Sequence, residues 1–150
     1  MNQAVIHSIY IAKDRGAPQE MINEGKLIEG LGLEKDRFFK TGIVTLIEIE
    51  EIEAFTNKTG LNLNLGEIRR NLVTKHIRLN SLVGQEFTVG RARLKGTELC
   101  EPCASLGKRL SNNQVTSKTI VRELTHKAGI RAEIINGGLI FEGTPINTDK

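Results

Sequence analysis

The stretch RAEIINGGLIFEG, residues 131–143, carries the clearest local structural signal in the chain. Two short apolar runs flank Asn136-Gly137, and this dipeptide is the preferred type I′ turn between two paired strands. The stretch therefore predicts an antiparallel β-hairpin near the end of the chain. We expect this hairpin to close a β-rich domain.

Short apolar segments separated by turn residues occur along most of the remaining sequence. Glycine is frequent between them, as it is between the short strands of β-rich domains. Six such segments are predicted to be strands, over residues 4–12, 20–30, 42–48, 68–77, 85–90 and 91–99. The last two are expected to pair antiparallel around Gly90, whereas Gly25 weakens the strand over 20–30.

Two segments show helical periodicity instead. Residues 45–60 begin with Thr45 and Glu48 at capping-box spacing and end at Gly60, a residue type that commonly terminates helices. Residues 115–129 form the second predicted helix, with Gly129 lying just past its end. The expected inward-facing and capping residues are Ile49, Ile52 and Leu46 or Phe55 in the first helix, and Thr116 or Ser117, Ile120, Leu124 and Val121 in the second.

The strands do not alternate regularly with helices, which argues against a parallel α/β sheet. Seven or so short strands with two helices instead predict a mainly β fold, namely a closed β-barrel or strongly curved sheet with peripheral α-helices. A length of 150 residues is typical of one domain, so residues 1–150 are expected to fold as a single unit.

The composition narrows the classes of function. The net charge of +3 suits an anionic small molecule as well as a nucleic acid. The shortage of aromatic residues (4%, with no Trp) argues against a nucleic-acid partner, because single strands are bound by base stacking. No apolar run approaches the length that spans a bilayer, and the N-terminal segment lacks the features of a signal peptide. We therefore expect a cytoplasmic protein with reduced thiols and no membrane partner.

The only two cysteines form the sequence Cys100-Glu-Pro-Cys103. They could be small buried apolar residues, a redox couple, or one reactive thiol beside a bystander. A thioredoxin-like couple is disfavoured because no βαβ unit surrounds the pair. A zinc site is disfavoured because the three histidines (His7, His76, His126) show no ligand spacing. Cys103 precedes a segment that could open a short helix at Ala104, where backbone amides stabilise a thiolate.

Basic residues suggest a site for an anion. On a strand, Arg69 and Asn71 share one face and Arg70 lies on the other, and an arginine beside an asparagine is suited to gripping a phosphate and a heterocycle. The alternative is a pair of solvated arginines on an edge strand. Asp36 and Arg37 could form an ion pair in a turn, or that turn could simply be solvated.

Seven stretches, taken in order, form a longer pattern: GLGLEKDRFF, VTLIEIEEIEAF, RRNLVT, LNSLVGQEFTVG, LCEPCASL, HKAGIRAEIINGG and EGTPI. Their order and spacing resemble the MOSC domain, the C-terminal module of molybdenum-cofactor sulfurases that also occurs as a standalone protein. The resemblance implies a β-barrel with peripheral helices. Members of that family often have Gly-Asp-Arg and then His where this chain has Lys35-Asp36-Arg37 and then Phe38-Phe39.

The resemblance also implies a function. Cys103 matches the family's signature cysteine, which ligates the metal of a molybdopterin-type cofactor or carries sulfur as a persulfide, in pyridoxal-independent chemistry. Arg69, Arg70 and Asn71 match the cofactor-contacting strand, and Asp36 and Arg37 lie in another matching stretch. A sulfur donor such as a cysteine desulfurase is then an expected partner.

Two other classes of function stay open at this level. One is a non-enzymatic β-barrel module that holds an anionic ligand or RNA through residues 69–78, and the other is a structural domain with inert cysteines. Whether the chain is an enzyme is left open. The cofactor hypothesis makes one geometric demand, that residues 69–71 and Cys103 line one pocket, on the order of 10 Å apart.

Overall fold

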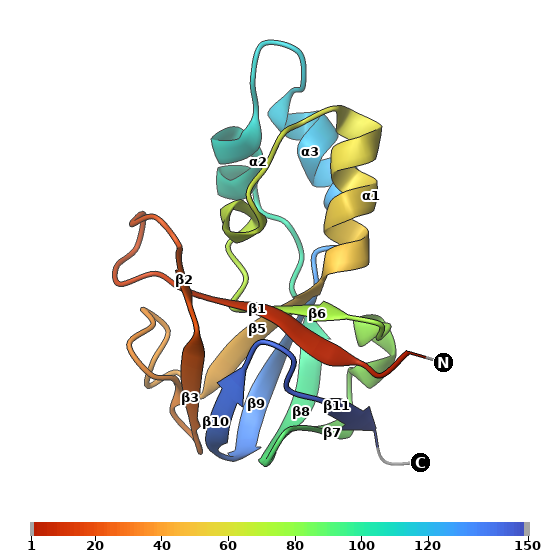
Figure 1. Cartoon of the computed structure of the whole chain (residues 1–150). Helices are drawn as coiled ribbons and strands as arrows, with labels where there is room; N and C mark the ends of the chain where they lie inside the picture. Colours follow the sequence, from red (N-terminus) through yellow and green to blue (C-terminus); the bar gives the residue numbers. More distant parts are fainter. Residues whose placement is uncertain (1, 149–150) are drawn as a thin grey trace.

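The structure is a computed structural model and describes residues 2–148. It is mainly β, with a strand-rich body below and three helices gathered together at one end (Figure 1). The strands are β1 (Val5–Ile11), β2 (Glu20–Ile22), β3 (Glu24–Ile28), β4 (Gly32–Leu33), β5 (Ile43–Glu48), β6 (Leu72–Lys75), β7 (Glu86–Val89), β8 (Ala92–Leu99), β9 (Ile130–Asn136), β10 (Gly138–Phe141) and β11 (Ile146–Thr148). The helices are α1 (Ile49–Thr59), α2 (Ala104–Leu110) and α3 (Ser117–Leu124), with 3₁₀ turns η1 (Leu65–Ile68) and η2 (Leu79–Leu82).

The strands form two sheets. The larger has the order β11-β7-β8-β9-β5-β6-β1-β2, and the smaller has the order β10-β3-β4. The larger sheet is strongly curled, so that the start of β11 lies beside β1. Two hydrogen bonds join them there, from Ile6 N to Thr144 O and from Ile146 N to Ala4 O. Over residues 2–148 neither sheet closes on itself through a continuous ladder. The mainly β fold is therefore confirmed, and the closed barrel stays a prediction.

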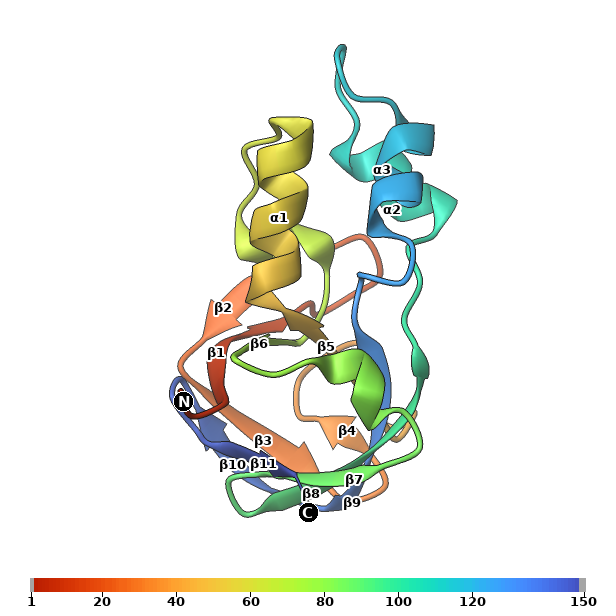
Figure 2. The same ribbon diagram turned by 90° about the vertical axis from the view of Figure 1, so that its right-hand side faces the viewer.

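Two clusters of buried apolar residues form the core of the protein. The first lies among the strands and includes Phe87, Leu94 and Ile6, all fully buried. The second lies between the helices and one end of the sheet, where Ile52 of α1 and Ile120 of α3 meet the apolar end of the larger sheet. Figure 2 shows the helices standing beside one another on that end. No helix among the described residues is both long and apolar enough to cross a membrane.

The stretch 131–143 does not form the predicted hairpin. β9 pairs with β5 and β8, whereas β10 pairs with β3 in the other sheet. Asn136-Gly137 is thus a corner at which the chain passes from one sheet to the other. Gly137 is required there for a different reason from the one predicted: a Cβ atom on it would overlap the carbonyl oxygen of Leu27. The two strands were predicted correctly, and their pairing was wrong.

Two other predicted strands are shorter than expected. The segment 20–30 breaks at Asn23 because β2 belongs to the larger sheet and β3 to the smaller. The segment 68–77 contains a strand only from Leu72 to Lys75, since the 3₁₀ turn η1 ends at Arg69 in a left-handed conformation. The antiparallel pair around Gly90 is confirmed as β7 and β8.

Both predicted helices form, but each is shorter than expected: α1 starts only at Ile49, and α3 ends at Leu124, well before Gly129. α1 ends at Gly60, whose φ of 75° gives the predicted left-handed cap, and α3 begins with Thr116 accepting a hydrogen bond from Thr119 N. The predicted capping box of Thr45 and Glu48 is wrong. Thr45 lies inside β5, where its hydroxyl bonds to Asn71 instead.

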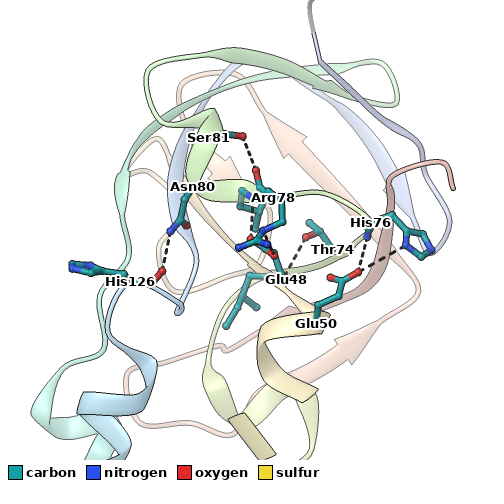
Figure 3. A network of polar contacts seen from close by, with 10 residues as sticks. Glu48, Glu50, Thr74, His76, Arg78, Asn80, Ser81 and His126 are labelled. Carbon is teal, nitrogen blue, oxygen red and sulfur yellow. Dashed lines mark hydrogen bonds and ion pairs between the residues drawn. The ribbon is translucent and has the colours of Figure 1, made fainter. Parts of the chain in front are cut away.

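Glu48 is the N-cap residue of α1, but its side chain makes no capping hydrogen bond to that helix and instead joins it to η2. Its buried carboxylate accepts a hydrogen bond from Leu79 N at 2.9 Å and lies 3.4 Å from Nε of the exposed Arg78 (Figure 3). Burial raises the pKa of Glu48, although the Leu79 amide and Arg78 lower it in part. Burying the ionised carboxylate of Glu48 therefore costs free energy, and its hydrogen bond to the buried Leu79 amide offsets part of that cost.

A pair of substitutions separates these two effects. Glu48→Ala leaves the buried Leu79 amide without an acceptor and should lower the free energy of unfolding by about 1–3 kcal/mol. Glu48→Gln keeps an acceptor and should be milder. Because the pKa of Glu48 is raised in the folded protein, the folded state binds this proton more tightly, so wild type should gain stability relative to Glu48→Gln as pH falls toward the ordinary pKa of a glutamate. Urea unfolding across this pH range measures both effects, and a difference that is constant with pH would contradict the assignment.

Candidate functional site

One cavity of about 560 Å³ brings together residues from widely separated parts of the sequence. This volume lies within the range of pockets that hold small molecules. Cys103 and Arg69, which were predicted to share one pocket, both line it. The lining residues are Arg15, Gly16, Arg37, Phe38, Thr41, Ile43, Thr45, Arg69, Arg70, Cys100, Glu101, Cys103, Ser105, Leu106, Arg109 and Arg131.

The two thiols differ in accessibility. Both are free, but Cys100 is buried and Cys103 is exposed. Cys103 is the N-cap residue of α2, and its carbonyl accepts a hydrogen bond from Gly107 N, so the predicted helix start at Ala104 is confirmed. Cys100 is fixed at the end of β8 by its amide, which donates to Gly129 O at 2.8 Å. Both cysteines line the cavity, but Cys103 is therefore the thiol that is more accessible to a ligand or to a reagent from solvent.

Arg70 braces the segment that carries the cysteines. Its buried guanidinium donates to three backbone carbonyls, those of Ala128 (2.8 Å), Cys100 (2.9 Å) and Ile68 (3.3 Å). Because these carbonyls belong to three different segments, Arg70 ties them together at the cavity wall. Its hydrogen-bonding capacity is thus largely used within the protein.

Arg70 also interacts electrostatically with both cysteines. Burial lowers the pKa of Arg70, Cys100 and Cys103 oppose this shift, and Arg131 adds to it. Arg131 is itself held by Glu98 at 3.0 Å. The thiol end of the cavity therefore contains two guanidinium groups, both of which already have partners in the protein.

Two of the predicted site residues do not line the cavity. Asn71 is buried, and its side chain bonds to Thr45 and to the carbonyl of Tyr10. Asp36 is buried as well, and its carboxylate accepts hydrogen bonds from Ala12 N (2.9 Å) and Phe38 N (3.1 Å). Both residues hold backbone segments that carry the cavity wall, and no ion pair joins Asp36 to the neighbouring arginine among the described contacts.

Arg69 has a guanidinium with unused capacity. Its Nη1 donates to Ala17 O at 2.7 Å, whereas its Nη2 is buried without a hydrogen-bond partner among the described residues. Burial lowers the pKa of Arg69, Arg109 and Arg37 lower it further, and Asp36 opposes them. The positive charges of Arg109 and Arg37 therefore repel that of Arg69, and all three residues line the cavity. An anion bound there would relieve that repulsion.

The charge of the cavity is strongly asymmetric. Six arginines line it, and among the described lining residues Glu101 is the only carboxylate. Glu101 is engaged by His126, whose backbone amide and Nδ1 lie 2.7 and 2.5 Å from its oxygens. Arg15, Arg109 and Arg131 were not predicted from the sequence, because no local pattern distinguishes them from solvated arginines. They come together only in the folded chain.

Comparison with known proteins identifies the family and the fold of the chain. The family model of the MOSC domain matches residues 36–147. Among solved structures, the YUAD protein from Bacillus subtilis aligns with a TM-score of 0.84 at 17% identity, covering 99% of this chain and 98% of that one. YiiM from Geobacillus stearothermophilus aligns with a TM-score of 0.73 at 15% identity, covering 98% of this chain and 75% of that one.

YiiM from Escherichia coli gives a similar result, with a TM-score of 0.72 at 17% identity, covering 100% of this chain and 71% of that one. No curated protein matches the chain. At these identities the solved structures establish a shared fold alone, but the family model spans most of the chain. The chain belongs to the MOSC domain family.

Proposed function

We propose that the protein binds an anionic, molybdopterin-type cofactor in the arginine-lined cavity, with Cys103 as the thiol that faces it. The observation that carries this proposal is the meeting of one exposed thiol and six arginines in a single cavity of ligand size. A site for a neutral or cationic ligand would not gather this much positive charge. Membership in the MOSC domain family supports the identity of the ligand.

The residues present fit such a cofactor. Its phosphate suits the cluster of Arg37, Arg69 and Arg109, where a buried Nη2 donor lacks a partner. Its metal end suits the soft sulfur of Cys103. When bound, the cofactor would supply two-electron redox chemistry at molybdenum. The chain itself holds the anion, orients the thiol through the Arg70 brace and leaves Cys103 accessible.

A second function is favoured by the exposure of Cys103. A thiolate that is accessible at a cavity can attack the outer sulfur of a persulfide on a donor protein, so that the donor's S–S bond breaks, its cysteine leaves as a thiolate, and the sulfane sulfur is held as a persulfide here. This role would make a cysteine desulfurase the expected partner and would require no metal. Sulfur transfer explains why Cys103 is accessible, but it does not explain why three arginines cluster in the cavity. It is therefore the second candidate function.

The binding module that uses residues 69–78 for RNA receives little support from the geometry. Arg70 is buried against backbone carbonyls, and Arg78 lies beside Glu48. His76 donates its amide to Glu50 (Figure 3). Arg70 and Arg78 thus already have partners, and Arg69 lines the cavity instead of presenting an open surface.

Arg69→Gly tests the role of the arginine cluster. Arg69 has a φ of 66°, so glycine removes about 1 kcal/mol of backbone strain while it also removes the guanidinium. We expect a free energy of unfolding close to that of wild type, but at least tenfold weaker retention of the cofactor, because a charge-assisted hydrogen bond to phosphate is lost. The variant is mixed with cofactor released from a molybdoenzyme, desalted, and assayed for pterin fluorescence and molybdenum.

Arg91→Ala is the matched control, since Arg91 is exposed and lies outside the cavity. It should retain cofactor as wild type does. Equal retention by wild type and Arg69→Gly would contradict the proposed phosphate site, and failure of wild type to retain any pterin would contradict cofactor binding as a whole.

A further inference from the structure

Part of the cavity lining is apolar, although arginines dominate the charge of the cavity. Phe38, Ile43 and Leu106 line the cavity together with the hydroxyl-bearing Thr41. Phe38 is 40% exposed, so a large aromatic surface faces open space instead of the core. An exposed ring in a ligand-sized cavity is a common anchor for a ligand.

The loop that carries Phe38 is held rigidly. Asp36 accepts a hydrogen bond from Phe38 N at 3.1 Å, and the Thr41 hydroxyl donates to Phe38 O at 2.6 Å. Lys35 and Lys40, on either side of the loop, have φ values of 72° and 85°, a conformation that lysine rarely adopts. The surrounding bonds thus fix an unfavourable backbone that presents the ring, and a preorganised group binds without an ordering cost.

Arg37 lies against the same ring. Its guanidinium carbon is 4.3 Å from the centroid of Phe38, in a cation–π contact, and both residues line the cavity. Arg37 also belongs to the electrostatic cluster around Arg69. The stacking surface and the anion site are therefore adjacent parts of one wall.

We propose that Phe38, backed by Arg37, is a stacking platform for a flat heteroaromatic ring on the anionic ligand. This inference rests on the proposed function and deepens it by naming the residue that would hold the ring of the ligand, apart from the arginines that would hold its phosphate. The arginine cluster holds the phosphate, and the ring of the ligand lies against Phe38. A ligand with the same phosphate but no ring would occupy only half of this site.

Adenosine monophosphate and ribose 5-phosphate test the inference, because they differ only in the heteroaromatic base. In calorimetric titrations the purified wild-type chain should bind the nucleotide about tenfold more tightly than the sugar phosphate, the ratio expected for one stacked base. Phe38→Leu keeps apolar bulk but removes the ring, and should bring the two affinities within about twofold. Phe38→Tyr keeps the ring and should restore the preference.

Phe141→Leu is the matched control, since Phe141 is 45% exposed on β10, outside the cavity. It should keep the wild-type preference. Unchanged discrimination by Phe38→Leu would overturn the stacking platform. If Arg69→Gly binds both probes as wild type does, or if wild type binds neither, the anion site of the proposed function fails instead.

Discussion

Gly129→Ala is expected to lower the free energy of unfolding by about 2–5 kcal/mol, a large part of the total for a domain of this size. Gly129 has a φ of 97°, and a Cβ atom would overlap the carbonyl oxygen of Leu46 on β5. The left-handed conformation costs alanine about 1–2 kcal/mol, and forcing the overlap apart costs about 1–3 kcal/mol more. Thermal unfolding should show a fall in Tm of about 10 °C.

Gly143→Ala separates the two causes. Gly143 also has a positive φ, 88°, but a Cβ atom there would meet nothing within 4 Å. It should therefore lose only the conformational share, about 1–2 kcal/mol. Equal losses of unfolding free energy in Gly129→Ala and Gly143→Ala would show that a Cβ atom at residue 129 does not overlap the carbonyl oxygen of Leu46.

The position of Gly129 also matters for the site. Its carbonyl accepts the amide of Cys100, and the carbonyl of the preceding Ala128 accepts Nε of Arg70. The close packing of this turn against β5 thus positions the segment that leads to Cys103. A shift of the turn should disturb the cavity as well as the core.

Cys103→Ser is expected to abolish rapid alkylation of the native protein. Wild type should react quickly at one thiol, because Cys103 is exposed whereas Cys100 is only 4% exposed. A reagent reaches Cys100 only when the structure opens locally, and an opening that costs about 3 kcal/mol slows the reaction roughly a hundredfold. Labelling with iodoacetamide followed by mass spectrometry of peptides measures both rates.

Cys100→Ala is the companion variant, since alanine places no hydroxyl in the buried site. It should retain the rapid reaction of wild type. Rapid labelling that survives in Cys103→Ser and disappears in Cys100→Ala would mean that the roles of the two thiols are reversed.

Local patterns predicted the elements better than their pairing. Gly90 and Gly60 were recognised correctly because a turn and a helix end depend on a few neighbouring residues. Asn136-Gly137 was misread because nothing local reveals that β9 and β10 belong to different sheets. The close approach of Gly137 to Leu27, a residue distant in the sequence, decides that corner.

The site was predicted in part for the same reason. The residue types at Arg69 and Cys103 could be singled out from the sequence, and the fold brings them to one cavity. The strand alternation that grouped Asn71 with Arg69 failed, because β6 starts only at Leu72 and Arg69 is a left-handed cap. Asn71 instead satisfies buried backbone and hydroxyl groups, a role that depends on distant partners.

The central claim is that one cavity holds an anionic cofactor beside Cys103. Native mass spectrometry of the chain, purified from cells supplied with molybdate, tests it most directly when combined with metal analysis of the same sample. The account predicts a bound species with the mass of a phosphate-bearing pterin, together with molybdenum, and loss of both in Arg69→Gly. The bare polypeptide mass without molybdenum, or an adduct that Arg69→Gly keeps in full, would contradict it.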